Sequence, residues 1–192
     1  MPRRVDHGER RRTITEAVCR LTASGGLAAA TFREVAAEAG VSVRLVQYYF
    51  GSKGELMLAT QRHVAERATA RSLARVAAAG DDPRASLRAL LGSFIPDDAE
   101  SRENMVLFVA LNTAALVDPA LGRPETWEVP DALRAAVVAR LRDAGVRPGV
   151  DIELEASLLV AVVPSLAQAV LGGVSTDDAC RVLDYALERA LR

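Results

Sequence analysis

The residues best suited to chemistry lie between positions 31 and 53, and the chemistry they suit is hydrogen bonding to nucleic acid. Arginine can donate two hydrogen bonds to guanine, glutamine can pair with adenine, and tyrosine can reach a phosphate. On the short helix expected here, the side chains left facing outward are Ser42, Val43, Arg44, Gln47 and Tyr48. A solvated helix face would show the same residue types, so this pattern alone leaves both interpretations open.

The charge distribution indicates a polyanionic partner for the N-terminal segment only. The chain has 192 residues and a formal net charge of -1, yet residues 1–53 hold nine basic and five acidic side chains. The remainder holds 15 basic and 20 acidic side chains. Clustered arginines gain most where they neutralise phosphates. A solvated N-terminal tail would explain the same excess, and charge alone leaves the two explanations equal.

The elements that position these residues are predicted to be helices. Helical spacing of apolar residues recurs from end to end, and no stretch alternates for long enough to predict a strand, so we expect an all-α fold of about nine helices. Thr31 and Glu34 have the spacing of a capping box, Gly40 stops the helix they open, and Ser42 is placed to cap the next one. Two helices joined by a short glycine turn form a helix-turn-helix, in which the second helix enters the DNA major groove.

Turn and cap signals delimit the other helices. Ser52 to Glu55 repeats the capping-box spacing, Asp82 and Pro83 suit a helix start, and Thr176 to Asp178 is expected to cap the last helix. An irregular connection between the sixth and seventh helices contains Trp127, the only tryptophan. Outside the helix-turn-helix we expect helices near residues 9–24, 53–79, 83–95, 100–117, 131–144, 151–171 and 176–191.

Composition excludes several classes of protein. Cys19 and Cys180 lie far apart without short-spaced partners, so we expect neither a disulfide framework nor a metal site. We find no glycine-rich phosphate loop after a strand and no nucleophile with a base at a known spacing, so we expect no enzyme and no cofactor. The longest apolar segment, 152–174, is interrupted by Glu153, Glu155 and Pro164. Without a signal peptide or a membrane span, a cytoplasmic protein is expected.

The segment TFREVAAEAGVSVRLVQYYFGSKGEL, residues 31–56, resembles the DNA-binding signature of the TetR family, and the likeness extends over about residues 10–60. It implies that Thr31 and Lys53 bind phosphates, that residues 42–44 approach base edges, and that Tyr49 touches the backbone or a base. Thr31 only capping its helix, and Tyr49 only packing, remain the alternatives. The family often has glycine where this chain has Arg44 and tyrosine where it has Gln47, so the operator sequence cannot be carried over.

The segments FVALNTAALVDPAL (108–121), PSLAQAVLGG (164–173) and ACRVLDYALERAL (179–191) are similar to the C-terminal region of the betaine-regulator branch of this family. The resemblance implies a helix-turn-helix domain at 1–53 and an effector-binding and dimerisation domain at 54–192. It also implies a ligand-responsive repressor that binds double-stranded operator DNA, with a small organic effector. Aromatic and amide side chains suit such a site. The candidate liners, each of which could instead be ordinary core, are Phe94, Phe108, Leu111, Asn112, Trp127 and Gln168.

The last two helices are predicted to pair with a second copy of the chain. Their apolar residues exceed what one small core needs, as expected of a homodimer through the eighth and ninth helices. A two-fold dimer predicts an approximately palindromic operator. Burial within one subunit is the alternative for these residues, and an activator or a regulator that responds to a partner protein is the alternative function. The apolar set is Leu158, Leu159, Val162, Val163, Leu166, Val170, Cys180, Leu183, Ala186, Leu187 and Ala190.

Overall fold

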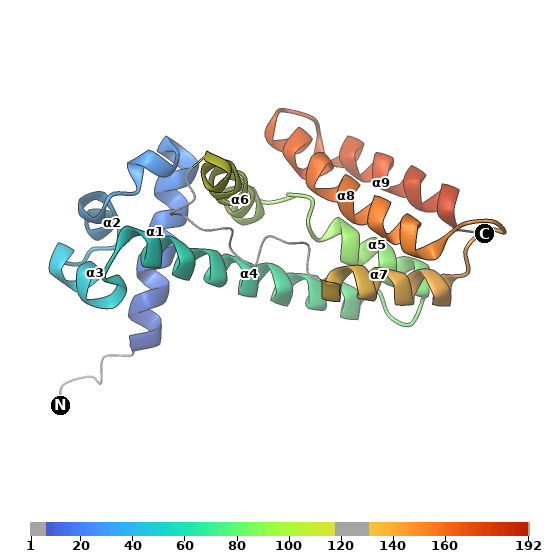
Figure 1. The fold of residues 1–192 in the computed structure, drawn as a ribbon, viewed down its shortest axis with the longest axis horizontal. Helices are drawn as coiled ribbons and strands as arrows, with labels where there is room; N and C mark the ends of the chain where they lie inside the picture. Colours follow the sequence, from blue (N-terminus) through green and yellow to red (C-terminus); the bar gives the residue numbers. More distant parts are fainter. Residues whose placement is uncertain (1–6, 118–130, 192) are drawn as a thin grey trace. The chain divides into compact units, whose positions relative to one another are not determined.

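The computed structural model describes residues 7–117 and 131–191, and within these ranges the chain forms nine α-helices and one short 3-10 turn (Figure 1). The expected all-α fold is confirmed, because the described residues contain a single isolated bridge, Val146 to Leu191, and no strand. In chain order the elements are α1 (His7–Gly25), η1 (Leu27–Ala29), α2 (Phe32–Glu38), α3 (Val43–Phe50), α4 (Lys53–Ala78), α5 (Pro83–Gly92), α6 (Ala99–Val117), α7 (Asp131–Ala144), α8 (Ile152–Leu171) and α9 (Thr176–Ala190).

The chain divides into two compact units. Among the described residues, unit 1 contains 7–65 and 106–117, and unit 2 contains 66–105 and 131–191. The helices α4 and α6 therefore each contribute one end to each unit. The functional division at 53 and 54 stays a prediction from the motifs.

Unit 1 is built around α1, which packs on α2 and is followed by the pair α2 and α3. Ile14, Ala17 and Val18 recur on one face of α1 at helical spacing and are fully buried. Val46 and Phe50 of α3, one turn apart, are also buried in this core. A single apolar stripe per helix thus fixes which side of α3 remains exposed.

Unit 2 is a layer of four helices, α5, α7, α8 and α9, that share one apolar core. Leu87, Leu141, Leu159 and Leu183 supply one fully buried leucine from each helix. By length and composition α8 is the one helix in the described residues that could cross a membrane. Its inward face, which includes Leu159, packs in this core instead.

The helix starts follow the cap signals with two corrections. Asp82 caps α5, with Pro83 in the first turn, as expected. The last helix is capped by Ser175, whose Oγ accepts from the Asp178 amide at 3.0 Å, and not by Thr176 to Asp178 as predicted. Thr176 instead donates its hydroxyl proton to another part of the chain.

The predicted capping box at the start of α2 is half formed. The Thr31 hydroxyl accepts from the Glu34 amide at 3.2 Å. The Thr31 amide, however, donates to the Ala29 carbonyl of η1, and the Glu34 carboxylate accepts from Arg33. The preceding 3-10 turn thus takes the donor that a capping box would have used.

Candidate nucleic-acid interface

Gly40 forms the turn between α2 and α3. Its φ is 65°, in the left-handed region that glycine enters without steric cost. The Gly40 amide donates to the Ala37 carbonyl and the Val41 amide to the Ala36 carbonyl, so two carbonyls at the end of α2 are satisfied. The backbone is extended again at Ser42, whose side chain caps α3. A tight turn followed at once by a capped helix produces the helix-turn-helix expected from the sequence.

The exposed side of α3 carries the side chains that suit base contacts. Arg44 and Gln47 lie one turn apart and are exposed, and Tyr48 is 74% exposed. No described residue forms an ion pair with Arg44, so its guanidinium is available to an external acceptor. All five residues predicted to face outward are exposed: Ser42, Val43, Arg44, Gln47 and Tyr48.

Thr31 and Lys53 stand at the starts of α2 and α4. The Thr31 hydroxyl accepts a hydrogen bond from the Glu34 amide, which leaves its proton free to donate to a phosphate. Lys53 is exposed in the first turn of α4, where the backbone amides add partial positive charge to the ammonium. Both positions suit an anion, and their contact with DNA remains a prediction.

Tyr49 differs from its neighbour Tyr48 because it is partly buried and held by α1. The Tyr49 hydroxyl lies 2.9 Å from Nδ1 of His7. Arg11 donates to the Tyr49 carbonyl at 2.8 Å, and its guanidinium lies 4.6 Å from the centre of the Phe50 ring. Sequence reasoning did not assign His7 or Arg11 to this site. The arginine-rich start of α1 was the visible signal, but the register against α3 depends on tertiary packing.

Part of the positive charge in the N-terminal segment is neutralised within unit 1. Arg20 of α1 pairs with Glu38 of α2 at 2.6 Å, and Arg33 pairs with its neighbour Glu34 at 2.9 Å. These exposed pairs contribute little stability, because solvent screens them. They do remove two arginines from the set that suits DNA, and they leave Arg44 of α3 and Lys53 of α4 exposed, together with Arg10 and Arg12 of α1.

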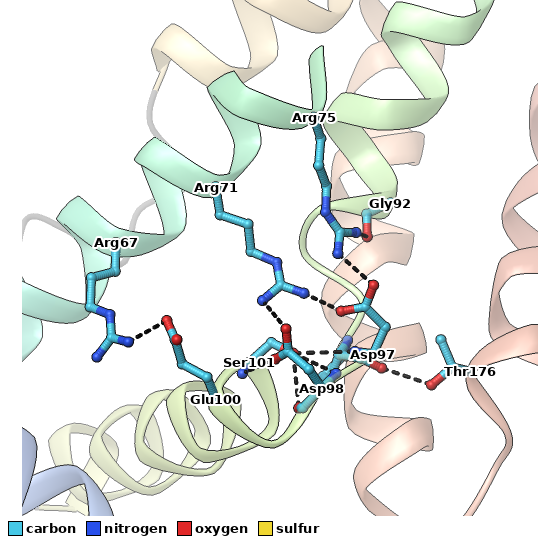
Figure 2. A network of polar contacts seen from close by, with 10 residues as sticks. Arg67, Arg71, Arg75, Gly92, Asp97, Asp98, Glu100, Ser101 and Thr176 are labelled. Atoms are coloured by element: carbon cyan, nitrogen blue, oxygen red, sulfur yellow. Dashed lines mark hydrogen bonds and ion pairs between the residues drawn. The ribbon is translucent and has the colours of Figure 1, made fainter. Parts of the chain in front are cut away.

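The second half of α4 carries three arginines at four-residue intervals, which we call the arginine ladder: Arg67, Arg71 and Arg75 (Figure 2). Four-residue spacing aligns side chains on one helix face. Arg67 pairs with Glu100 at 2.5 Å, Arg71 pairs with both Asp97 and Asp98, and Arg75 pairs with Asp97 at 2.5 Å. The ladder therefore ties this half of α4 to the connection between α5 and α6.

The same connection also contacts α8 and α9. Thr176, in the first turn of α9, donates to the Pro96 carbonyl at 2.8 Å (Figure 2). Arg102 donates to the Val170 carbonyl near the end of α8 at 3.3 Å. Residues 96–102 thus form a corner that is hydrogen-bonded or ion-paired to α4, α8 and α9.

Asp98 is the titratable group of this corner whose protonation is most perturbed. Hydrogen bonds from the backbone amide and then the hydroxyl of Ser101 lower the pKa of Asp98 from 3.8 to about 2, and Arg71 adds a smaller contribution in the same direction. Each of these interactions favours the carboxylate over the carboxylic acid. Asp98 therefore remains a carboxylate, able to pair with Arg71, at any pH well above 2.

The six residues expected to line a ligand site fall on different parts of the chain. Phe94 packs against the core of unit 2, and Gln168 is exposed on α8. Phe108, Leu111 and Asn112 lie on the part of α6 that belongs to unit 1, where Leu111 is buried. Trp127 lies outside the described residues. The ligand site stays a prediction.

The helices α8 and α9 each expose large apolar side chains. On α8 these are Leu154 and Leu158, which are 69% and 56% exposed. On α9 they are Val182 and Tyr185, and the latter is 62% exposed. We call these four residues the outer stripe.

Part of the apolar set from which a partner surface was predicted is corrected by burial. The core of unit 2 itself buries six of the eleven residues, and a second copy of the chain cannot reach them. Those six are Leu159, Val163, Val170, Leu183, Leu187 and Ala190. Of the predicted set only Leu158 lies in the outer stripe, because helical spacing alone does not tell which of two apolar faces turns inward.

A capped helix-turn-helix with exposed arginine, glutamine and tyrosine, continued by an all-helical body, is typical of the helix-turn-helix class of DNA-binding proteins. Residues 14–60 match the model of bacterial regulatory proteins of the tetR family, and residues 83–192 match that of the BetI-type transcriptional repressor C-terminal region. The chain belongs to the TetR family, with a BetI-type C-terminal region, as the resemblance in sequence implied.

Individual relatives agree with this assignment. The HTH-type transcriptional regulator BetI of Burkholderia mallei is 36% identical over 114 residues, which are 59% of this chain and 58% of the relative. The match thus spans less than two thirds of that curated relative's length. Both the family models and these relatives are regulators, not enzymes.

Solved structures share the fold over nearly the whole chain. A putative TetR-family regulator from Rhodococcus sp. has a TM-score of 0.80 and 26% identity, with 96% of this chain and 100% of that one covered. A putative regulator from Saccharomonospora viridis, solved in complex with choline, has a TM-score of 0.83 and 23% identity, with coverage of 96% and 98%.

Proposed function

We propose that the protein is a cytoplasmic, ligand-responsive repressor that binds a palindromic operator in double-stranded DNA as a homodimer. The observation that carries the proposal is the exposed side of α3. Arg44 and Gln47 extend from this helix, and its other face packs in the core. The second helix of such a motif enters the major groove with its N-terminal residues toward the bases. The match of residues 83–192 to a repressor C-terminal region supports the direction of regulation.

Each predicted contact has a separate role. Arg44 and Gln47 would contact base edges and so carry sequence specificity, with Ser42 and Val43 beside them at the start of α3. Thr31 and Lys53 would bind phosphates on either side and contribute affinity without sequence preference. Tyr48 and Tyr49 would contact the sugar-phosphate backbone.

The second copy of the chain is proposed to pack on the outer stripe. Two leucines, a valine and a tyrosine exposed on adjacent helices form an apolar surface that a soluble protein normally covers. A two-fold axis through α8 and α9 would bring each stripe against its own copy and present two α3 helices to the DNA. The spacing of the two α3 helices would then set the spacing of the operator half-sites.

The signal is proposed to travel through α4. This helix begins at Lys53 in unit 1 and ends in unit 2, where the arginine ladder fastens it to the corner at 96–102. A ligand that shifts the corner would shift the ladder and with it the helix that leads to the DNA-binding unit. By linkage, the ligand and the operator must weaken each other's binding by the same factor.

A small organic molecule is the proposed effector, with Phe94, Phe108, Leu111, Asn112, Trp127 and Gln168 as its candidate contacts. The alternative is an activator, or a regulator that answers to a partner protein and has no small-molecule effector. The exposure of Gln168 on α8, the helix of the outer stripe, favours a partner contact for that one residue. A ligand that raises the melting temperature of the dimer without any protein partner would favour the effector.

The decisive experiment is selection of bound fragments from randomised duplex DNA with the purified protein at physiological salt. Recovery of a palindrome supports specific dimeric binding and supplies the probe for an effector screen. Recovery of a single, non-repeated half-site contradicts the dimer, and recovery of no preferred sequence contradicts the DNA-binding proposal.

A further inference from the structure

Two side chains at the start of α1 contact the end of α3, the helix proposed to enter the major groove. Arg11 and His7 lie on the same face of α1, one turn apart. Both reach Tyr49, one through its carbonyl and the other through its hydroxyl. These contacts cross 38 and 42 residues of sequence, so they depend on the tertiary placement of α1 relative to α3.

Arg11 is exposed, yet its guanidinium contacts groups of the protein itself. Its Nη1 donates to the Tyr49 carbonyl at 2.8 Å, at the C-terminal end of α3, where the helix dipole favours a cation. The same guanidinium lies 4.6 Å from the centre of the Phe50 ring, within the range of a cation–π contact. Phe50 is 2% exposed, so this contact anchors Arg11 to the core of unit 1.

His7 determines what the Tyr49 hydroxyl can do. A neutral imidazole nitrogen either donates or accepts, and the 2.9 Å contact allows both directions. If Nδ1 accepted, the Tyr49 hydroxyl would donate its hydrogen to His7 and could not donate it to a phosphate. If Nδ1 donates, the proton stays free. The two rings also meet edge to face at 5.8 Å, which restricts the orientation of the phenol.

We infer that Arg11 and His7 are positioning residues for operator binding: Arg11 fixes the end of α3, and His7 donates to Tyr49 so that the tyrosine hydroxyl can donate to a phosphate. The inference rests on the proposed function. In this inference α1 contributes to DNA recognition through Tyr49, and neither Arg11 nor His7 contacts a phosphate itself.

The salt dependence of operator binding separates positioning from direct contact for Arg11. Each phosphate contact contributes about 0.9 to the slope of log K against log salt. A residue that contacts a phosphate in both subunits of a dimer therefore contributes about two. Arg11→Met should weaken binding by roughly 3- to 30-fold, as expected for losing a charged hydrogen bond and a cation–π contact, and leave the slope unchanged. Arg11→Lys should lose most of the same affinity, because a compact ammonium cannot lie flat over the Phe50 ring while it donates to the Tyr49 carbonyl. A slope reduced by about two, with Arg11→Lys near wild type, would overturn the inference.

A double-mutant cycle tests His7. His7→Phe keeps an aromatic ring but removes the nitrogen, and Tyr49→Phe removes the hydroxyl. Non-additive losses, with no effect of His7→Phe once Tyr49 is Phe, are expected. Additive losses would mean that His7 acts independently of Tyr49 and would overturn its role.

Two controls keep the outcomes apart. Arg84→Met removes an exposed arginine from α5 in unit 2 and should change neither affinity nor slope. Thermal unfolding of each variant shows that binding is measured well below its melting temperature. A wild-type protein that binds no sequence specifically overturns the proposed function and this inference together, whereas a wild-type protein that binds while the variants behave as direct contacts overturns the inference alone.

Discussion

Arg71 of α4 and Asp97 of the α5–α6 connection form an ion pair at the centre of a network that fastens the long helix to the helical body (Figure 2). Asp97 accepts from Arg75 as well, and Arg71 also binds Asp98. These two arginines and two aspartates pair with one another, so removing one charge leaves its partners with fewer opposite charges nearby. The network gives the proposed signal a physical path along α4.

We predict that Arg71→Gln loosens the second half of α4. The variant leaves Asp97 and Asp98 with fewer counter-charges and should make amide hydrogens of residues 66–78 exchange faster, by roughly fivefold to thirtyfold for a loss of about 1–2 kcal/mol. Hydrogen exchange followed by mass spectrometry measures this directly. Arg88→Gln is the matched control, because Arg88 forms its bidentate pair with Asp184 of α9 and not with a residue of α4. Equal acceleration of residues 66–78 in both variants would contradict the role of the ladder.

We predict opposite signatures for the two cations of the DNA-binding unit. Arg44→Ala should cost about 1–3 kcal/mol on the selected operator and relax the preference at one base pair of each half-site. Lys53→Ala should weaken all sequences alike and lower the salt slope. Titrations of operator and scrambled duplex at several salt concentrations measure both the sequence preference and the salt slope of each variant. If the specificity change followed Lys53 instead, the assignment of α3 as the base-contacting helix would be wrong.

We predict that Leu158→Glu separates the proposed dimer. Leu158 is half exposed on α8, and an unpaired charge in a covered apolar surface costs several kcal/mol, which should raise the dissociation constant by at least about a hundredfold. Sedimentation velocity at micromolar protein should then show a monomer. Leu73→Glu is the control, because Leu73 is 65% exposed on α4 outside the outer stripe, and this variant should remain dimeric. A dimeric Leu158→Glu variant would place the interface elsewhere.

We predict that Ser101, more than Arg71, controls the titration of Asp98. The pKa of Asp98 is about 2 in the folded protein and 3.8 in its ordinary state, so its stabilising contribution is complete above 3.8 and is lost as the pH falls through 2. Ser101→Ala and Arg71→Gln should each raise the pKa of Asp98 toward 3.8, but neither should bring it to 3.8, because the largest lowering contribution, the hydrogen bond from the Ser101 backbone amide, persists in both variants. Carboxyl chemical shifts followed by NMR between pH 1.5 and about 5 compare the two variants. A pKa of Asp98 that reached 3.8 in the Arg71→Gln variant would show that the ion pair dominates instead.

The sequence was sufficient for the features that depend on neighbours in the chain. Thr31, Ser42 and Ser52 each accept from an amide three residues ahead, and Gly40 turns the chain where its lack of a Cβ permits it. These bonds close within one helical turn, so residue type and spacing predict them. The outward set on α3 followed for the same reason, because helical periodicity assigns one face to Val46 and Phe50 and leaves the opposite face exposed.

Only the tertiary structure decided which residues meet across long stretches of chain. His7 with Tyr49, Arg71 with Asp97, and Arg88 with Asp184 lie 42, 26 and 96 residues apart, and no local pattern marks them as partners. The same reason explains why six residues of the apolar set on the last two helices are buried within the chain, because α8 and α9 are apolar on more than one face and only their packing against α5 and α7 buries Leu159 and Leu183. Local hydrogen bonds thus determined the helices and their caps. The contacts between helices depend on packing, which the sequence specifies only through the whole fold.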